Sequence, residues 1–106
     1  MIEDSGIFVI HHVSDSGYDK IYRDWTEGGA GEWRAFEKDA FAEVLDGMGR
    51  AISDSLAALI CHGVFDRFPG VRIASVENGS AWVDGLIGRL ALTYKKMPEA
   101  FKQDPV

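Results

Sequence analysis

The sequence has little cysteine and no long hydrophobic run. Its 106 residues include a single cysteine, Cys61, so no disulfide can form within the chain, and we expect a reducing, cytoplasmic location. No apolar stretch approaches the roughly 18 residues of a membrane span, and no charged-then-apolar signal peptide opens the chain. These absences predict a protein without a membrane partner.

Basic residues are also in the minority. The chain has 11 Lys+Arg against 17 Asp+Glu, a formal net charge of −6. Nucleic acids and anionic membranes are bound by basic patches, so this composition argues against both as partners. The 46% hydrophobic content is ordinary for a globular protein and sufficient for a core.

The order of the predicted elements repeats a β-then-α unit. A mostly β-branched apolar run predicts a strand over about 7–12, and residues 13–33 predict a long loop of the kind that surrounds active sites. Apolar periodicity predicts helices over about 34–62, a strand over 71–76 and a helix over about 80–96. Such units form parallel sheets with right-handed crossovers, and ligands bind at the carboxyl ends of the strands.

The residues that close these strands are the first candidates for chemistry. Because adjacent strand residues point to opposite faces, only His12 of the pair His11 and His12 shares a face with Ile10. An imidazole there can bind a metal or take a proton, or it can simply end the strand with hydrogen bonds. Glu77 occupies the matching place after the second strand. It can bind a metal, orient a water or act as a general base, or only favour the dipole of the next helix.

Other polar residues carry weaker signals. Asp15 and Tyr18 follow the first strand and are candidates for substrate contact, with a loop cap and aromatic packing as the ordinary alternatives. Asn78 or Ser80 is a candidate cap for the following helix. Cys61 and His62 are interpreted as structural, because no metal-ligand spacing joins them to another cysteine or histidine.

Two stretches resemble a known family. Residues 8–18, FVIHHVSDSGY, resemble the fifth barrel strand of the amidohydrolase-related TIM-barrel hydrolases, which include aminocarboxymuconate-semialdehyde decarboxylase and related aromatic-acid decarboxylases. Residues 59–83, LICHGVFDRFPGVRIASVENGSAWV, look like the next strand region of that family, and Gly-Arg-Leu at 88–90 resembles its helix ending. The similarity covers most of residues 5–94.

The resemblance implies roles for particular residues. By it, His12, with His11 as the second choice, is the metal ligand of the fifth strand, and Glu77 stands where many members carry a histidine that assists catalysis. The family holds zinc or a similar divalent ion, which activates water or polarises a substrate carboxylate or carbonyl. A small-molecule carboxylate or carbonyl substrate is therefore implied for full-length members.

Parts of the family pattern are missing. The sequence has no His-x-His pair, and no further strand is predicted to carry the family's last-strand aspartate. A (β/α)8 barrel needs at least about 200 residues. We therefore expect an α/β segment of a TIM barrel, with about two parallel strands and flanking helices, rather than a complete barrel.

The function expected of such a segment follows from what is missing. We expect a fragment of a metal-dependent hydrolase or decarboxylase that is inactive alone. The sequence leaves open whether the metal is present in this chain. We also expect homo-oligomers that form through exposed sheet edges and helix faces. One alternative is a non-enzymatic α/β binding or oligomerisation module. Another is a small complete enzyme that uses Glu77 and His12 as a metal-free acid–base pair.

Overall fold

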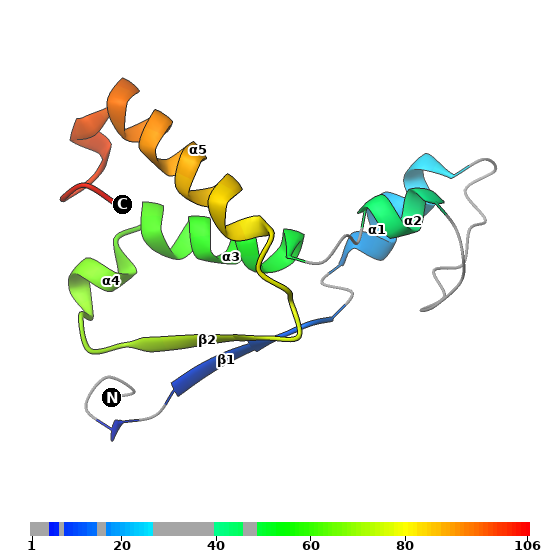
Figure 1. Cartoon of the computed structure of the whole chain (residues 1–106), viewed down its shortest axis with the longest axis horizontal. Helices are drawn as coiled ribbons and strands as arrows, with labels where there is room; N and C mark the ends of the chain where they lie inside the picture. Colours follow the sequence, from blue (N-terminus) through cyan, green and yellow to red (C-terminus); the bar gives the residue numbers. More distant parts are fainter. Residues whose placement is uncertain (1–4, 7, 15–16, 27–39, 46–48) are drawn as a thin grey trace.

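The computed structural model shows a short parallel sheet with helices on one side. The structure describes residues 5–6, 8–14, 17–26, 40–45 and 49–106. Strand β1 (Phe8–His12) pairs in parallel with β2 (Arg72–Val76), and the register places His12 beside Val76. Both strands therefore end at the same edge of the sheet (Figure 1).

The helices form two groups. In chain order the helical elements are α1 (Tyr18–Trp25), α2 (Ala40–Leu45), α3 (Arg50–Cys61), α4 (Val64–Arg67), α5 (Trp82–Lys96) and the 3-10 helix η3 (Pro98–Ala100). Helices α3 and α5 pack together on one side of the sheet, whereas α1 and α2 pack on each other beyond the carboxyl edge of the strands (Figure 1). Among the described residues, no helix has the length and hydropathy that a membrane span requires.

The two faces of the sheet differ in exposure. Val9 and Ile73 are paired in register and half-buried, so their face is the one that the helices cover. Phe8 and Ile10 point to the other face, where each is 62% exposed. In a (β/α)8 barrel the helices lie outside and the opposite face of each strand points into the barrel. The open face that carries Phe8 and Ile10 thus corresponds to a barrel interior.

Helix packing follows the predicted apolar stripes. Ile52 of α3 and Leu86 and Leu90 of α5 are buried. Arg89 donates a hydrogen bond of 2.8 Å to Oγ of Ser53, which satisfies that buried hydroxyl between the helices. The described residues form two parallel strands with flanking helices and no closed barrel, as expected from the sequence.

The predicted loop over 13–33 is wrong in part, because it contains α1. Tyr18 and Tyr22 are one helical turn apart, and Tyr22 is buried in a small cluster with Ala42 and Leu45 of α2. Tyr18 and Tyr22 thus lie on the packing face of a helix, whereas Trp25 at its end is 78% exposed. Residues 27–33 of that prediction lie outside the described part of the chain.

Candidate functional site

His12 and Glu77 meet at the carboxyl edge of the sheet. His12 is the last residue of β1, and Glu77 directly follows β2. Nε2 of His12 lies 3.0 Å from Oε2 of Glu77, and the two side chains are 58% and 71% exposed. Because the register sets His12 beside Val76, the residue after Val76 comes within reach of the imidazole. The structure thus brings together two of the residues that the sequence marked as candidates.

The second ring nitrogen of His12 is held by the backbone. Nδ1 lies 2.9 Å from the carbonyl oxygen of Val13, which can only accept, so this contact places a proton on Nδ1. Nε2 then faces Glu77, whose ionised carboxylate also only accepts. The contact between Nε2 and Glu77 is favourable when a proton or a cation lies between them. The site can therefore hold a proton, or it can supply two of the ligands of a metal ion.

His11 lies differently from its neighbour. It is half-buried on the face that carries Val9 and is paired in register with Ser75. The ion pair with Glu77 is made by His12, on the opposite face. Of the two adjacent histidines, His12 is therefore the one that contacts the candidate acid.

Glu77 has an unusual backbone conformation. Its φ is 62°, and it is the only residue other than glycine with a positive φ among the described residues. For an L-residue this left-handed conformation costs about 1–2 kcal/mol. Such strain gathers at functional sites, where the surrounding structure holds it in place. The left-handed conformation of Glu77 turns the chain sharply after β2, at the point where the Glu77 side chain contacts His12.

Asn78 joins the ends of the two strands. Its Nδ2 lies 3.0 Å from the carbonyl oxygen of His11, 2.8 Å from that of Val76 and 3.1 Å from Oγ of Ser75. The side chain is buried, with 5% exposed. The prediction that Asn78 or Ser80 caps the next helix is wrong: the cap position of α5 is Ala81, and no side chain caps that helix. Sequence reasoning missed the strand link because it depends on the pairing of distant strands.

Of the two predicted substrate-binding residues, Tyr18 does not join this pair. Asp15 lies outside the described residues. The Tyr18 hydroxyl donates a hydrogen bond of 2.6 Å to Oδ2 of Asp54, and the Arg50 guanidinium lies 5.4 Å from the centre of the Tyr18 ring. Burial raises the pKa of Tyr18, and the Asp54 carboxylate raises it further, while Arg50 acts in the opposite direction. The Tyr18 hydroxyl thus forms its hydrogen bond with a residue of α3.

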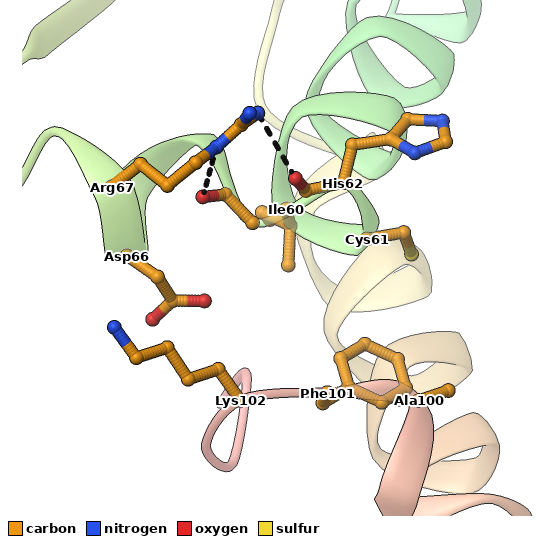
Figure 2. Close-up of a pocket in the computed structure, with 9 residues that line it drawn as sticks. Ile60, Cys61, His62, Asp66, Arg67, Ala100, Phe101 and Lys102 are labelled. Carbon is orange, nitrogen blue, oxygen red and sulfur yellow. Dashed lines mark hydrogen bonds between the residues drawn. The ribbon is translucent and has the colours of Figure 1, made fainter.

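A cleft lies at the other end of the sheet, near the start of β2. It has a volume of about 440 Å³ and lies between the end of α3, helix α4 and the C-terminal segment (Figure 2). The Arg67 side chain points toward the turn between α3 and α4, where it donates to the carbonyl oxygens of Gly63 and His62 at 3.3 and 3.2 Å (Figure 2). The Gly63 carbonyl also accepts from the Arg67 backbone N–H at 3.1 Å, so the side chain adds a partner for the carbonyl of His62, the C-cap residue of α3.

The described residues supply only part of a metal site. His12 and Glu77 place an imidazole nitrogen and a carboxylate oxygen 3.0 Å apart. That is close to the separation of about 3.3 Å between neighbouring ligands of tetrahedral zinc, given Zn–N and Zn–O distances of about 2.0 Å. Within the described ranges, no group of three or more His, Cys, Asp or Glu residues could hold an ion. The pair fits two ligands of a divalent cation, and a complete site needs others.

The comparisons with known proteins give one family of folds. No family model matches the sequence, and no curated protein does. The chain is similar to a solved amidohydrolase from Mycobacterium avium subsp. paratuberculosis K-10, with 39% sequence identity and a TM-score of 0.81 over 99% of this chain. It spans 25% of the length of that protein.

The fold is therefore that of a segment of an amidohydrolase-type TIM barrel. Two parallel strands with flanking helices match a quarter of the amidohydrolase chain, which confirms the predicted fold class. The predicted resemblance to the amidohydrolases is confirmed for the fold: the chain is a fragment of an amidohydrolase-like fold. The decarboxylase subgroup stays a prediction.

Proposed function

We propose that the chain is part of a metal-dependent protein of the amidohydrolase type, in which His12 is a metal ligand and Glu77 assists catalysis. The observation that carries the proposal is the contact of 3.0 Å between them at the carboxyl edge of the sheet. Catalytic residues of TIM barrels lie at that edge. The identity of 39% to an amidohydrolase over 99% of the chain supports the same class.

The residues of this chain fit such a role. The contact of Nδ1 of His12 with the Val13 carbonyl leaves Nε2 to act as the ligand, which is the arrangement that metal-binding histidines commonly use. A bound divalent cation, zinc by family resemblance, would activate a water or polarise a substrate carboxylate or carbonyl. Glu77, beside His12, would bind the cation or accept a proton from a nearby water.

The segment needs donors from elsewhere to work as an enzyme. A catalytic zinc commonly has three protein ligands, and no such group exists among the described residues. We therefore propose that these residues alone do not catalyse the hydrolysis or decarboxylation of small carboxylate or carbonyl substrates, and that they do so as part of a larger barrel.

Self-association belongs to the same proposal. Phe8 and Ile10 are each 62% exposed on the open face of the sheet, and Val76 is 38% exposed on the same face. An uncovered apolar face and unpaired strand edges favour pairing with further strands. We propose that the chain forms homo-oligomers through this face and through its helices.

A second function is favoured by the incomplete ligand set. An α/β scaffold whose described residues bring together only His12 and Glu77 as candidate donors can serve as a non-enzymatic binding or oligomerisation module. The two functions differ in metal binding, because the module needs no cation. The exposed pair can also act as a metal-free acid and base, and this would require turnover without metal.

Zinc titration of the purified chain separates these possibilities. We expect zinc binding that His12→Ala weakens by at least about tenfold, as loss of a ligand does, and that the matched variant His11→Ala leaves unchanged. Equal zinc affinity of the unsubstituted chain and His12→Ala would contradict the metal role. Absence of binding to the unsubstituted chain would favour the module. Hydrolysis of carboxylate or ester substrates by metal-free protein would favour the acid–base pair.

A further inference from the structure

We propose that Asn78 is the positioning residue that holds His12 and Glu77 opposite each other. The proposal rests on the function proposed for that pair. Nδ2 of Asn78 donates to the carbonyl oxygens of His11 and Val76, at 3.0 and 2.8 Å. One buried amide group thereby joins His11, the last residue but one of β1, to Val76, the last residue of β2, beside the candidate site.

The two carbonyls that Asn78 holds belong to the peptide units that precede the site residues. The His11 carbonyl lies in the same planar unit as the His12 nitrogen, and the Val76 carbonyl lies in the same unit as the Glu77 nitrogen. Holding these planes limits the directions in which the two side chains can leave the backbone, because each plane sets the N–Cα bond about which the residue turns. The contact of 3.0 Å between His12 and Glu77 follows from that orientation.

The chemistry requires an amide at this position. Both carbonyl oxygens can only accept, so the side chain must present a group with two N–H donors. Aspartate has the same shape, but its carboxylate would place another acceptor against these oxygens. Ser75, whose Oγ lies 3.1 Å from the same Nδ2, is a third partner that does not touch either peptide unit before the site residues.

Asn78 also encloses the strained residue. The hydrogen bond from Asn78 to the Val76 carbonyl spans Glu77 and closes a turn around it. Glu77 lies within that turn at a φ of 62°. The Val76 carbonyl also accepts a hydrogen bond of 3.2 Å from the Val13 backbone N–H, so Asn78 supplies one of two bonds to it. We expect loss of the Asn78 bond, the shorter of the two, to let the backbone at Glu77 relax and the carboxylate move away from His12.

The test compares variants of the whole chain in a double-mutant cycle. The coupling between His12→Ala and Glu77→Ala is measured by urea unfolding in four backgrounds, namely the unsubstituted chain, Asn78→Ser, Asn78→Asp and Ser75→Ala. We expect coupling in the unsubstituted chain and in Ser75→Ala, and its loss in both Asn78 variants. A purely structural role for Asn78 would lower stability but leave the coupling unchanged, and that result would overturn the proposal.

Zinc affinity gives a second reading that does not depend on overall stability. It is measured where circular dichroism shows each variant to be folded. We expect Asn78→Asp to weaken zinc binding by about tenfold, the usual effect of losing support behind a ligand, Asn78→Ser to weaken it less, and Ser75→Ala to leave it unchanged. Should Asn78→Asp not fold, Asn78→Ser carries both measurements, because its hydroxyl still donates one bond.

The outcomes separate this proposal from the function on which it rests. Zinc binding that is lost in His12→Ala but kept in every folded Asn78 variant would overturn the positioning role alone. Absence of zinc binding, together with coupling that disappears only in the Asn78 variants, would overturn the metal role and support positioning. Absence of coupling in the unsubstituted chain would overturn the positioning of the pair.

Discussion

The indole of Trp82 lies directly against the backbone of Gly49. A Cβ atom at residue 49 would lie 2.0 Å from Cδ1 of Trp82, and the φ of Gly49 is 101°. Nε1 of Trp82 donates a hydrogen bond of 3.0 Å to the carbonyl oxygen of Gly79, in the turn after Glu77. The start of α3 is thereby packed against the segment that carries half of the candidate site.

Gly49→Ala should destabilise the protein strongly. The added methyl group would overlap the indole and sit at a positive φ, two effects that together cost about 3 kcal/mol. The measurement is the free energy of urea unfolding. The matched control is Gly88→Ala, within α5, where an added Cβ meets open space and should stabilise by about 0.5–1 kcal/mol. Equal stability of both variants would show that Trp82 is free to move away.

Glycine at residue 77 should be better tolerated than alanine. Glu77→Gly and Glu77→Ala both remove the carboxylate, but only glycine adopts a φ of 62° without strain. We expect Glu77→Gly to be about 1 kcal/mol more stable than Glu77→Ala to urea unfolding.

Ser75 provides the control for this comparison. It lies within β2, where glycine carries an entropic penalty, so Ser75→Gly should be about 0.5–1 kcal/mol less stable than Ser75→Ala. The opposite order at residues 75 and 77 is the signature of strain at Glu77. The same order at both would contradict it.

The sequence could predict the two residues that meet but not what holds them. Alternation along the first strand placed His12 on the face of Phe8 and Ile10. Because parallel strands end on the same side of a sheet, the residue that follows the second strand, Glu77, was expected near His12. The role of Asn78 depends on a hydrogen bond to a residue 67 positions earlier in the chain. Local pattern could not distinguish that role from a helix cap.

Helix α1 was missed for a related reason. Its glycine-rich surroundings suggested a loop, and its short apolar face is meaningful only through packing of Tyr22 on α2. The Tyr22 and Phe41 rings stack with centroids 5.9 Å apart. Local propensity is a weak guide for a helix of 8 residues, since tertiary packing supplies most of the stability of short helices.

Alkaline pH should weaken the contact between α1 and α3. Burial, and then the hydrogen bond to Asp54, raise the pKa of Tyr18 above its ordinary value of 10.0. An acid whose pKa is raised by folding contributes stability that is complete below about pH 10 and is lost as pH rises through the higher folded-state pKa. The free energy of unfolding should therefore fall above pH 10.

Two variants test the cause of this fall. Tyr18→Phe removes the titrating group, so its stability should fall less with pH over this range. Asp54→Asn removes the carboxylate that favours the neutral phenol, so Tyr18 should release its proton at lower pH, seen as earlier phenolate absorbance in the ultraviolet. Identical alkaline profiles for the unsubstituted chain and Tyr18→Phe would show that other groups cause the fall.

A charge on the open face of the sheet should prevent self-association. Ile10 is 62% exposed beside Phe8, and pairing of this face in an oligomer would bury both side chains. Ile10→Lys should shift the chain toward monomer in analytical ultracentrifugation, because an unpaired ammonium group is costly to bury. The matched control is Gln103→Lys, at an exposed residue of the C-terminal segment that belongs neither to the open face nor to a helix, and it should leave the oligomer unchanged. A clean monomer of the unsubstituted chain, or an equal effect of both substitutions, would count against association through the open face of the sheet.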